Sequence, residues 1–502
     1  MTDQEADVVI VGSGISGVLV ARELLASGSS VLILERGERV SWAQQRRARR
    51  WEGDGSTVEH NHDADPDGLD WPWQYVYGLG GTLNRWGATS PRLLPEDFEM
   101  RSRYGVMRDW PFGYDVLLPH YQAAERALAI AGPRSALMPG AGFPQPPHPP
   151  SQVDRLVRDH LGPFIPLPQA RPTRPVGDSP ACCGSFSCQL CPVNAKATVL
   201  NRLGDVLAAP GLRILDRTVA ARLETDPSGR RIAAISCVSS GGDPFRVRGR
   251  RFVLAANGIE SAGMLLRSGL TGGDTGHFLF DHRNAQILVT TRRETAPGRG
   301  ASLITGASYA YYPGAHRARR AGVLLLPYNP GPPNTPIFES LVAGMVAGRS
   351  GRRLREDATR EWKRTVALDV FVDDLPDAGN MVRLGTKRDA FGLPRNLVTF
   401  RPPSDYFKRG VAHVLEDLPR RLAPLGAGEA RFAYTTAGGH LLGTARTGDG
   451  DNGVVDADLR HRRRENLWVT GGAVFPTYSP SHPTLTIAAL AVRLGRLLAR
   501  GA

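Results

Sequence analysis

Two histidines near the end of the chain have the chemistry needed to move a proton. His440 stands in a glycine-containing segment, and His482 directly precedes Pro483 and Thr484. A neutral imidazole near pH 7 can accept a proton from a hydroxyl group. Because proline suits the first position of a helix, His482 is expected beside a helix N-terminus. The two look like a catalytic pair. The alternatives are a surface-loop residue for His440 and a plain helix-cap residue for His482.

Four of the five cysteines gather within ten residues, at Cys182, Cys183, Cys188 and Cys191. Thiolates at this spacing suit an iron–sulfur cluster or zinc. Disulfides or free thiols are the alternatives, although disulfides would be unusual in a cytoplasm. The fifth, Cys237, lies in an apolar strand-like run, which predicts a buried thiol.

A glycine motif near the start of the chain has the form of a phosphate-binding turn. Gly12, Gly14 and Gly17 fit G-x-G-x-x-G. The first glycine permits a tight turn, the second lets the backbone approach a pyrophosphate, and the third lets the helix pack close to the strand. The helix N-terminus then offers free N–H groups to the phosphates. The expected contacts within the turn also include Ser13, Ile15 and Ser16.

The elements that position this turn can be read from the same stretch. A strand is expected at 7–11, a helix at 15–26 that ends at Gly28, and a second strand at 31–35. Glu35 ends the second strand 18 residues after Gly17, where a carboxylate can accept from the ribose hydroxyls of an adenosine. Arg36 is placed beside it among the cofactor contacts.

The elements that position the two histidines lie in the second half. A helix is expected at 484–500, and 109–130 also has a helical pattern. Residues 213–255 alternate like strands, as do 285–291 and 366–372. The block from 284 to 434 therefore predicts a substrate-binding sheet.

The cofactor is predicted to be FAD used without a nicotinamide. The chain contains no second G-x-G-x-x-G that could hold NAD(P)H beside the first. A second glycine-rich stretch, with Gly78, Gly80, Gly81 and Gly87, adds backbone donors and room for a large planar ligand. Reducing equivalents would then come from the substrate itself.

The bulk composition excludes several classes of protein. The 502 residues suggest two domains, and a hydrophobic fraction of 41% is ordinary for a globular chain. A net charge of +13 raises the question of nucleic acid, but no nucleic-acid motif accompanies the dispersed arginines. The charge could instead favour acidic substrates or an acidic electron-transfer partner. No apolar run approaches the roughly 18 residues of a membrane span, and no usual signal peptide is visible. A cytoplasmic location is expected, with export on a partner's signal left open.

Nearly the whole chain resembles the glucose–methanol–choline (GMC) family of FAD oxidoreductases. Besides the first glycine motif, the resemblance rests on segments 80–87, 109–111 with Tyr121, 253–261, Asp281-His282, 440–448, 466–477 and 483–487. The middle block matches little.

The resemblance implies an α/β fold and an activity. A Rossmann-like FAD-binding domain would comprise 1–40, 76–100, 180–283 and 436–502. A substrate-binding domain on a mixed, mainly antiparallel sheet would comprise 101–179 and 284–435. His440 would be the main base in the oxidation of an alcohol or sugar hydroxyl, with hydride passing to flavin N5. His482 stands where many bacterial relatives carry Asn, and would hold the substrate oxygen.

The resemblance also implies the flavin contacts and the fate of the electrons. The expected further contacts are Gly80, Gly81, Thr82, Asn84, Trp86, Gly87, Val219, Ala256, Gly472, Ala473, Pro483 and Thr484. Some relatives tether FAD through a histidine where this chain has Arg85, so non-covalent FAD is predicted. The cysteine run resembles the iron–sulfur segment of bacterial FAD-dependent glucose dehydrogenases. The acceptor would be oxygen or an electron-carrier protein. An oxidase of a specialised-metabolite alcohol, a flavin-dependent lyase or isomerase, and a non-catalytic scaffold are the alternatives.

Overall fold

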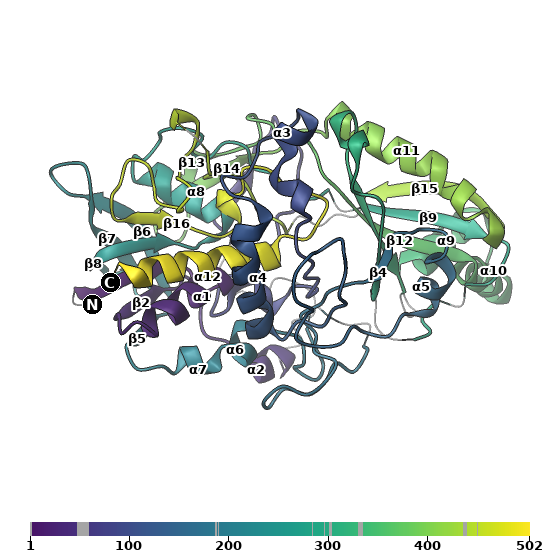
Figure 1. The fold of residues 1–502 in the computed structure, drawn as a ribbon, viewed down its shortest axis with the longest axis horizontal. Coiled ribbons are helices and arrows are strands. Elements are labelled where there is room, and N and C mark those ends of the chain that lie inside the picture. The colour runs from purple at the N-terminus through teal and green to yellow at the C-terminus, as the bar shows by residue number, and fades with distance from the viewer. Residues whose placement is uncertain are drawn as a thin grey trace.

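The computed structural model describes residues 3–47, 60–185, 188, 190–283, 285–295, 297–300, 304–329, 335–434, 439–448 and 450–501. Its elements form two main sheets, which Figure 1 shows side by side along the long axis, and a smaller third sheet in the same half of the molecule as the first. Both chain ends lie on the same side of the molecule (Figure 1). No helix among the described residues is both long and apolar enough to cross a membrane.

The first sheet is mainly parallel and contains the predicted strand–helix–strand unit. Its order is β5 (Leu212–Leu215), β2 (Val31–Leu34), β1 (Gln4–Val11), β8 (Pro244–Leu254), β7 (Ile232–Ser239) and β6 (Thr218–Thr225), with β16 (Leu467–Val469) beside β8. The strands β5, β2, β1, β8 and β16 run parallel. Strand β7 pairs antiparallel with both β8 and β6, so β6 again has the direction of the parallel strands. Burial on both faces explains the continuous apolar runs of β1 and β2.

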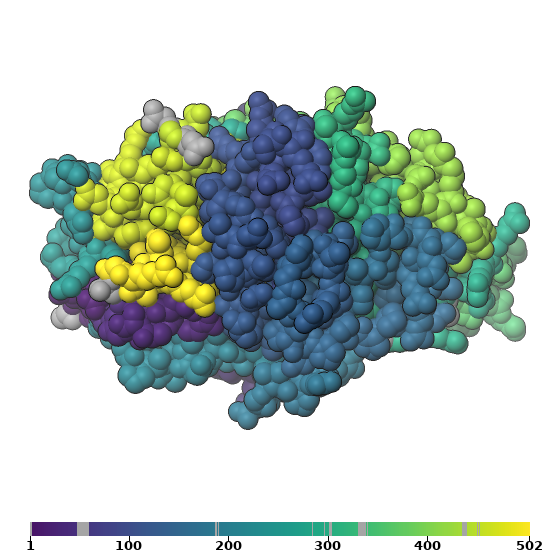
Figure 2. All heavy atoms as spheres, in the orientation of Figure 1, coloured from purple at the N-terminus to yellow at the C-terminus, as the bar shows by residue number. Residues whose placement is uncertain are grey.

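The last helix joins the two ends of the chain. Helix α12 (Thr484–Arg500) packs against α1 (Ile15–Leu25) and α4 (Tyr114–Leu128). In the space-filling view these segments adjoin as yellow, purple and dark blue surfaces (Figure 2). The bounds of α12 match the prediction, and Gly28 ends the turn after α1 with φ +82°. The N-terminus of α12 is thereby fixed over the first sheet.

The second sheet is antiparallel throughout its described pairs. Its order is β15 (Ala427–Tyr434), β9 (Ala285–Thr291), β12 (Thr365–Val372), β11 (Val323–Tyr328), β10 (Gly306–Tyr311) and β4 (Phe164–Pro166). Helix α11 (Asp405–Arg421) covers one face and shares its apolar core. The strands predicted at 285–291 and 366–372 are confirmed as β9 and β12. The predicted fold class, an α/β domain with a mainly antiparallel second sheet, is confirmed.

The remaining elements connect these layers. The third sheet is β13 (Met381–Arg388), β14 (Pro394–Thr399) and β3 (His62–Ala64), packed near α8 (Asn257–Arg267). The other helices are α2 (Trp42–Arg47), α3 (Met100–Tyr104), α5 (Gln152–Val157), α6 (Val199–Arg202), α7 (Gly204–Leu207), α9 (Thr335–Val346) and α10 (Gly351–Lys363).

Candidate active site

Three histidines from three distant parts of the chain meet between the two main sheets. His282 lies just before β9, His440 lies in the segment 439–448, and His482 lies just before α12. The Nδ1 atoms of His282 and His440 are 2.7 Å apart, and the ring centroids of His440 and His482 are 5.3 Å apart. The predicted catalytic pair is thus together in the fold, joined by a third imidazole.

A short backbone pairing explains how His282 and His440 meet. The N–H of Leu442 donates to the carbonyl of Phe280 at 3.1 Å, and the N–H of Phe280 donates back to Leu442 at 3.0 Å. Each histidine is two residues from this antiparallel bridge, so alternation puts both side chains on the same face. Gly258 and Gly472 leave room for this segment, since a Cβ on either would lie 2.7 or 2.4 Å from the carbonyl oxygen of Leu441.

The hydrogen bonds of His282 determine which nitrogen of His440 is free. The Nε2 of His282 lies 2.6 Å from the carbonyl oxygen of Ser479, an acceptor only, so Nε2 must donate. Burial lowers the pKa of His282 to about 4, which keeps its ring neutral near pH 7. Its Nδ1 is therefore an acceptor, and the Nδ1 of His440 donates to it. The proton-accepting atom of His440 is then Nε2.

His440 is itself neutral near pH 7. Burial, together with the nearby His282 and His482, lowers the pKa of His440 well below its ordinary value. The residue as a whole is nevertheless only half-buried. A neutral imidazole with one fixed N–H has the properties of a general base.

Asp281 supports His440 through the backbone. Its Oδ1 accepts from the N–H of His440 at 2.9 Å, and its Oδ2 accepts from the indole N–H of Trp71 at 3.0 Å. Burial raises the pKa of Asp281 to about 7. Oxygen and nitrogen atoms of Asp281, His282 and His440 all lie within 4.8 Å of one another. Two imidazoles that shared a zinc ion at about 2.1 Å would hold their nitrogens more than 3 Å apart, so the observed 2.7 Å is a direct hydrogen bond.

His482 closes the site from the side of α12. Pro483 caps the helix, one position before its predicted place, and Thr484 is the first helical residue. The ring of Phe371, from β12, lies 4.1 Å from the ring of His482 between centroids. Burial and the nearby His282 lower the pKa of His482 well below its ordinary value. Its buried Nδ1 has no hydrogen-bond partner among the described residues.

The nucleotide turn has the steric features that its glycines predict. Gly12 has φ +102°, and a Cβ on Gly17 would lie 2.0 Å from the carbonyl oxygen of Gly12. A Cβ on Gly14 would meet no protein atom within 4 Å, so the space beside this residue is open. In the described part of the chain no side chain caps α1. Its first N–H groups therefore suit a pyrophosphate, and the turn fits the ADP part of FAD.

Glu35 links the two glycine-rich stretches. Its Oε2 accepts from the N–H of Ser13 at 3.1 Å and from its hydroxyl at 2.6 Å. Its Oε1 accepts from the N–H groups of Gly37 at 2.8 Å and Gly78 at 2.9 Å. The N–H of Gly80 likewise donates to Ser13. The N–H groups of Gly78 and Gly80, which were expected to face a ligand, therefore connect the two glycine-rich stretches. The contact between Glu35 and the ribose stays a prediction.

The other predicted cofactor contacts fall around this turn. Gly81 lies against Gly14, Gly471 beside Ser16, and Ala256 beside Gly12. Val219 follows Thr218, whose N–H donates to the carbonyl of Glu35. Arg36 forms an ion pair with Asp389, and Ala473 is fully buried. The hydroxyl of Thr82 accepts a hydrogen bond from the N–H of Val76, and the side chains of Asn84 and Trp86 donate to the carbonyls of Leu79 and Ala197. Gly472 lies against Leu441, whereas the space around Gly87 is open. Arg36 also lies over the ring of Tyr77.

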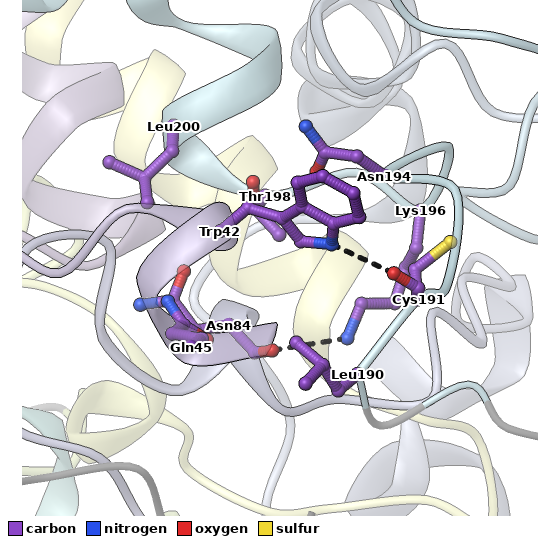
Figure 3. Close-up of a pocket in the computed structure, with 9 residues that line it drawn as sticks. All are labelled: Trp42, Gln45, Asn84, Leu190, Cys191, Asn194, Lys196, Thr198 and Leu200. Atoms are coloured by element: carbon purple, nitrogen blue, oxygen red, sulfur yellow. Dashed lines mark hydrogen bonds between the residues drawn. The ribbon is translucent and has the colours of Figure 1, made fainter. Parts of the chain in front are cut away.

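The cysteine segment lies directly against the second glycine-rich stretch. The buried ammonium of Lys196 donates to the carbonyls of Trp86 at 2.9 Å and Asn84 at 3.3 Å. Figure 3 shows this lysine with the indole of Trp42, which donates to the carbonyl of Cys191. These residues line a pocket of about 270 Å³, a volume that includes space open to solvent. Burial lowers the pKa of Lys196 to about 7.

The cysteines are free thiols in this structure. Disulfides are absent among the described cysteines, and Cys237 is the buried thiol that was predicted. Three thiolates on one zinc ion, at about 2.3 Å each, would place their sulfurs about 3.8 Å apart. No three sulfurs in the described part of the chain lie within 4.8 Å of one another, which argues against a preformed zinc site.

The roles of several residues of this site do not follow from the sequence. Asp281 and His282 stand in a segment that resembles the family, and no pattern marks Ser479, Trp71 or Phe371. The adjacent acid and imidazole at 281 and 282 were the available signal. Trp71 and Phe371 reach the site only through the tertiary fold.

Comparison with known proteins points to one family. Two family models described as GMC oxidoreductase match residues 168–284 and 419–491. A model described as an NAD(P)-binding Rossmann-like domain matches residues 10–71.

Three curated relatives and one solved structure extend this similarity over the chain. The 6'''-hydroxyparomomycin C oxidase of Streptomyces lividus is 31% identical, with 99% of this chain and 92% of that protein covered. The fructose dehydrogenase large subunit of Gluconobacter japonicus is 29% identical, with coverage of 97% and 96%. The paromamine 6'-oxidase of Streptomyces fradiae is also 29% identical, with coverage of 99% and 92%. The crystal structure of pyridoxine 4-oxidase from Mesorbium loti superposes with a TM-score of 0.66 at 18% identity, covering 98% of this chain and 99% of that one, which supports the fold.

Proposed function

Because this chain belongs to the GMC oxidoreductase family, and so is an oxidoreductase that acts on CH–OH groups, we propose that His440 is its general base. The reaction is the oxidation of an alcohol or sugar hydroxyl to the carbonyl. The observation that carries this proposal is the hydrogen-bonded line from the Ser479 carbonyl through His282 to His440. That line leaves the Nε2 of His440 unprotonated and able to accept a proton.

The side chains of the site have separate roles in the transfer of the substrate proton. The substrate hydroxyl loses its proton to the Nε2 of His440. His482 holds the substrate oxygen from the other side, since its ring lies 5.3 Å from that of His440. When bound, FAD supplies the acceptor of the hydride that leaves the carbon, and so takes up both electrons. Asp281 opposes the positive charge that develops on His440.

The proposed FAD site consists of the residues that fit it sterically. The turn from Gly12 to Gly17 would hold the pyrophosphate, and Glu35 and Arg36 would lie toward the adenosine. The N-terminus of α12, whose first N–H groups receive no side-chain cap among the described residues, would face the flavin ring with its partial positive charge. Arg85 stands where a tethering histidine would be needed, so the flavin is proposed to be non-covalent. Acid precipitation should then leave the flavin in the supernatant.

The acceptor of the electrons is proposed to be either oxygen or an electron carrier. Two of the relatives are named as oxidases, and a third is named as the large subunit of a dehydrogenase. Lys196 and Ala197 follow the cysteine run along the chain and bond to residues of the second glycine-rich stretch. An iron–sulfur cluster on the nearby cysteines would therefore adjoin the flavin segment, which favours a carrier. Iron and acid-labile sulfide in the purified protein, with absorbance beyond the flavin bands, would support the cluster. Flavin bands alone would reject it.

Anaerobic flavin bleaching distinguishes oxidation from the alternatives. Mixing with a panel of sugars and alcohols should bleach the flavin with at least one member, which a lyase or isomerase without net oxidation would not do. His440→Gln should abolish bleaching while flavin stays bound. The matched control is His160→Gln, in the turn after α5, which should bleach like the wild type. Unchanged bleaching in His440→Gln would contradict the proposed base and favour a non-catalytic scaffold or a different base.

The division into domains and the location of the protein remain part of this proposal. The FAD-binding domain is proposed to include 1–40, 76–100, 180–283 and 436–502, and the substrate-binding domain 101–179 and 284–435. The location is proposed to be the cytoplasm, and the substrate a small alcohol or sugar-like molecule.

A further inference from the structure

The face of the second sheet that looks away from α11 carries a polar pair. Strand β12 alternates, and Val366, Leu368, Val370 and Val372 all join the core shared with α11. Asp369 and Phe371 point to the opposite face. Phe371 contacts His482 there, with 4.1 Å between ring centroids. The face that bears Asp369 is therefore the face that closes the active site.

Asp369 is paired across the sheet with Gln286. The two are direct neighbours in the antiparallel register of β12 and β9, and the amide of Gln286 donates to Oδ1 of Asp369 at 2.7 Å. Gln286 is buried, whereas Asp369 is only half-buried. An amide that donates to one carboxylate oxygen fixes the orientation of the carboxylate and leaves the second oxygen for another donor. Along the strand, Asp369 is about 7 Å from Phe371.

Asp369 has no cationic partner among the described residues. Two buried carboxylates lie against arginines, Asp373 with Arg317 at 2.7 Å and Glu125 with Arg92 at 2.6 Å. Asp281, by contrast, is held by neutral donors, as Asp369 is. Desolvation raises the pKa of Asp369 to about 6, and only the hydrogen bond from Gln286 opposes this rise. A carboxylate that is partly removed from water without a cationic partner is destabilised, and a ligand that carries a positive charge would offset this cost.

A tyrosine stands diagonally beside this carboxylate. On β11, Leu326 is opposite Asp369 and Tyr328 is opposite Ala367, so Tyr328 is the diagonal neighbour on the same face. Its side chain is half-buried, and burial and Asp369 raise its pKa to about 12. A neutral tyrosine next to a carboxylate offers both a hydroxyl and a ring face to a cation.

We propose that Asp369, oriented by Gln286, binds an ammonium group of the substrate, which is therefore an amino sugar or a comparable amino alcohol. The hydroxyl that reacts at His440 and the ammonium at Asp369 belong to one molecule that spans from His482, past Phe371, to the sheet. This inference rests on the proposed function and names the substrate class of the same site.

The test uses three probes that differ at one substituent: D-glucosamine, N-acetyl-D-glucosamine and D-glucose. Holoenzyme is heated with each probe at equal concentration, and the thermal midpoint is measured with no turnover required. D-Glucosamine should raise the midpoint more than either neutral sugar. Asp369→Asn should remove that preference, with at least a tenfold loss in D-glucosamine affinity and less than a twofold change for D-glucose. Asp159→Asn, the same change at an exposed position, should behave like the wild type.

Two results would overturn the inference: a wild type with no preference for D-glucosamine, or an Asp369→Asn variant that keeps the preference. His440→Gln separates this failure from that of the proposed function. If Asp369 binds the ammonium group, the His440→Gln variant should keep the rise in thermal midpoint with D-glucosamine, even though its flavin is no longer bleached by substrate. If Asp369→Asn is too unstable to assay, Gln286→Leu provides the second variant. This variant keeps the carboxylate of Asp369 but removes the amide that orients it. It should weaken the binding of D-glucosamine and leave the binding of D-glucose unchanged.

Discussion

The imidazoles of His282 and His440, 158 residues apart in the chain, meet through their Nδ1 atoms at 2.7 Å. Because the Nε2 of His282 is already committed to the Ser479 carbonyl at 2.6 Å, the direction of the bond between the two rings is fixed. His282 thus acts as a positioning residue that selects the tautomer of His440. A carboxylate serves this purpose in many hydrolases, whereas here the group is a neutral imidazole that stays uncharged because it is buried.

Replacing His282 should separate tautomer control from simple packing. His282→Leu removes the acceptor for the N–H of His440, so flavin reduction should slow by about 10- to 100-fold. His282→Gln offers an amide oxygen to His440 and an amide N–H to Ser479, and should recover most of the rate. Stopped-flow reduction measures both variants, with thermal midpoints to show that each is folded. Equal rates in the leucine variant and the wild type would refute tautomer control.

Asp281 should give the reductive half-reaction its dependence on pH. Burial raises the pKa of Asp281 to about 7, so the carboxylate is charged above pH 7 and increasingly protonated below it. The charged form stabilises the imidazolium that develops on His440, and the rate should therefore rise as pH increases through 7. His440 is neutral throughout this range, because burial lowers its pKa well below the ordinary value.

Asp281→Asn tests this assignment directly. The variant should reduce its flavin more slowly than the wild type at pH 8, with a rate that is flat between about pH 6 and 8. The asparagine oxygen can still accept from the N–H of His440, so the loop should stay in place. If the inflection near pH 7 persists in Asp281→Asn, another group is responsible for it.

Substitutions at Gly14 and at Gly17 in the nucleotide turn should have different effects. A Cβ on Gly17 would lie 2.0 Å from a backbone oxygen, so Gly17→Ala should destabilise the fold even without FAD. A Cβ on Gly14 meets no protein atom within 4 Å, so Gly14→Ala should fold normally. The added methyl group would occupy the space of the pyrophosphate and should therefore weaken FAD binding. Thermal midpoints of apoprotein and flavin titration distinguish the two outcomes. Tight FAD binding by Gly14→Ala would show that the pyrophosphate lies elsewhere.

The sequence predicts those parts of the site that depend on local patterns. The G-x-G-x-x-G turn, the strands on either side and the helix after Pro483 follow from short-range sterics and periodicity, and the structure has them within three residues. The meeting of His440 with His482 follows from family resemblance, since no local pattern joins positions 42 residues apart.

The parts that the sequence did not predict depend on register between distant segments. His282 reaches His440 because Phe280 pairs with Leu442, and Asp369 reaches the active-site face because β12 pairs with β9 in one register. A shift of one residue would turn either side chain away. Likewise Gly78 and Gly80 were expected to donate to a ligand, but their N–H groups are bonded to Glu35 and Ser13, partners that only the folded chain brings near.

Arg317 binds three carboxylates in a buried charge cluster, and its loss should be costly. Its guanidinium donates to Asp97 and Asp373 at 2.7 Å each and to Glu96 at 3.1 Å, with the arginine side chain fully buried. Removing one partner of a buried ion pair leaves charge uncompensated, which typically costs about 3–5 kcal/mol. Arg317→Met should therefore lower the free energy of unfolding by about that amount at pH 8, measured by chemical denaturation. Arg319→Met, at an exposed site, is the control and should stay within about 0.5 kcal/mol of the wild type.

The loss of unfolding free energy in Arg317→Met, relative to the wild type, should become smaller as the pH falls. Burial raises the pKa of Asp373 to about 7 even with the arginine present, and removing the arginine raises it further. The folded variant then binds more protons than the unfolded chain, whose aspartates titrate near 3.9, so its stability falls as pH rises between those values. The buried histidines destabilise the wild type and the variant equally at low pH, because their pKa values are lowered in both. The difference between Arg317→Met and the wild type should thus be smaller at pH 5 than at pH 8. A difference that is constant with pH would mean that the carboxylates are not buried around Arg317 as described.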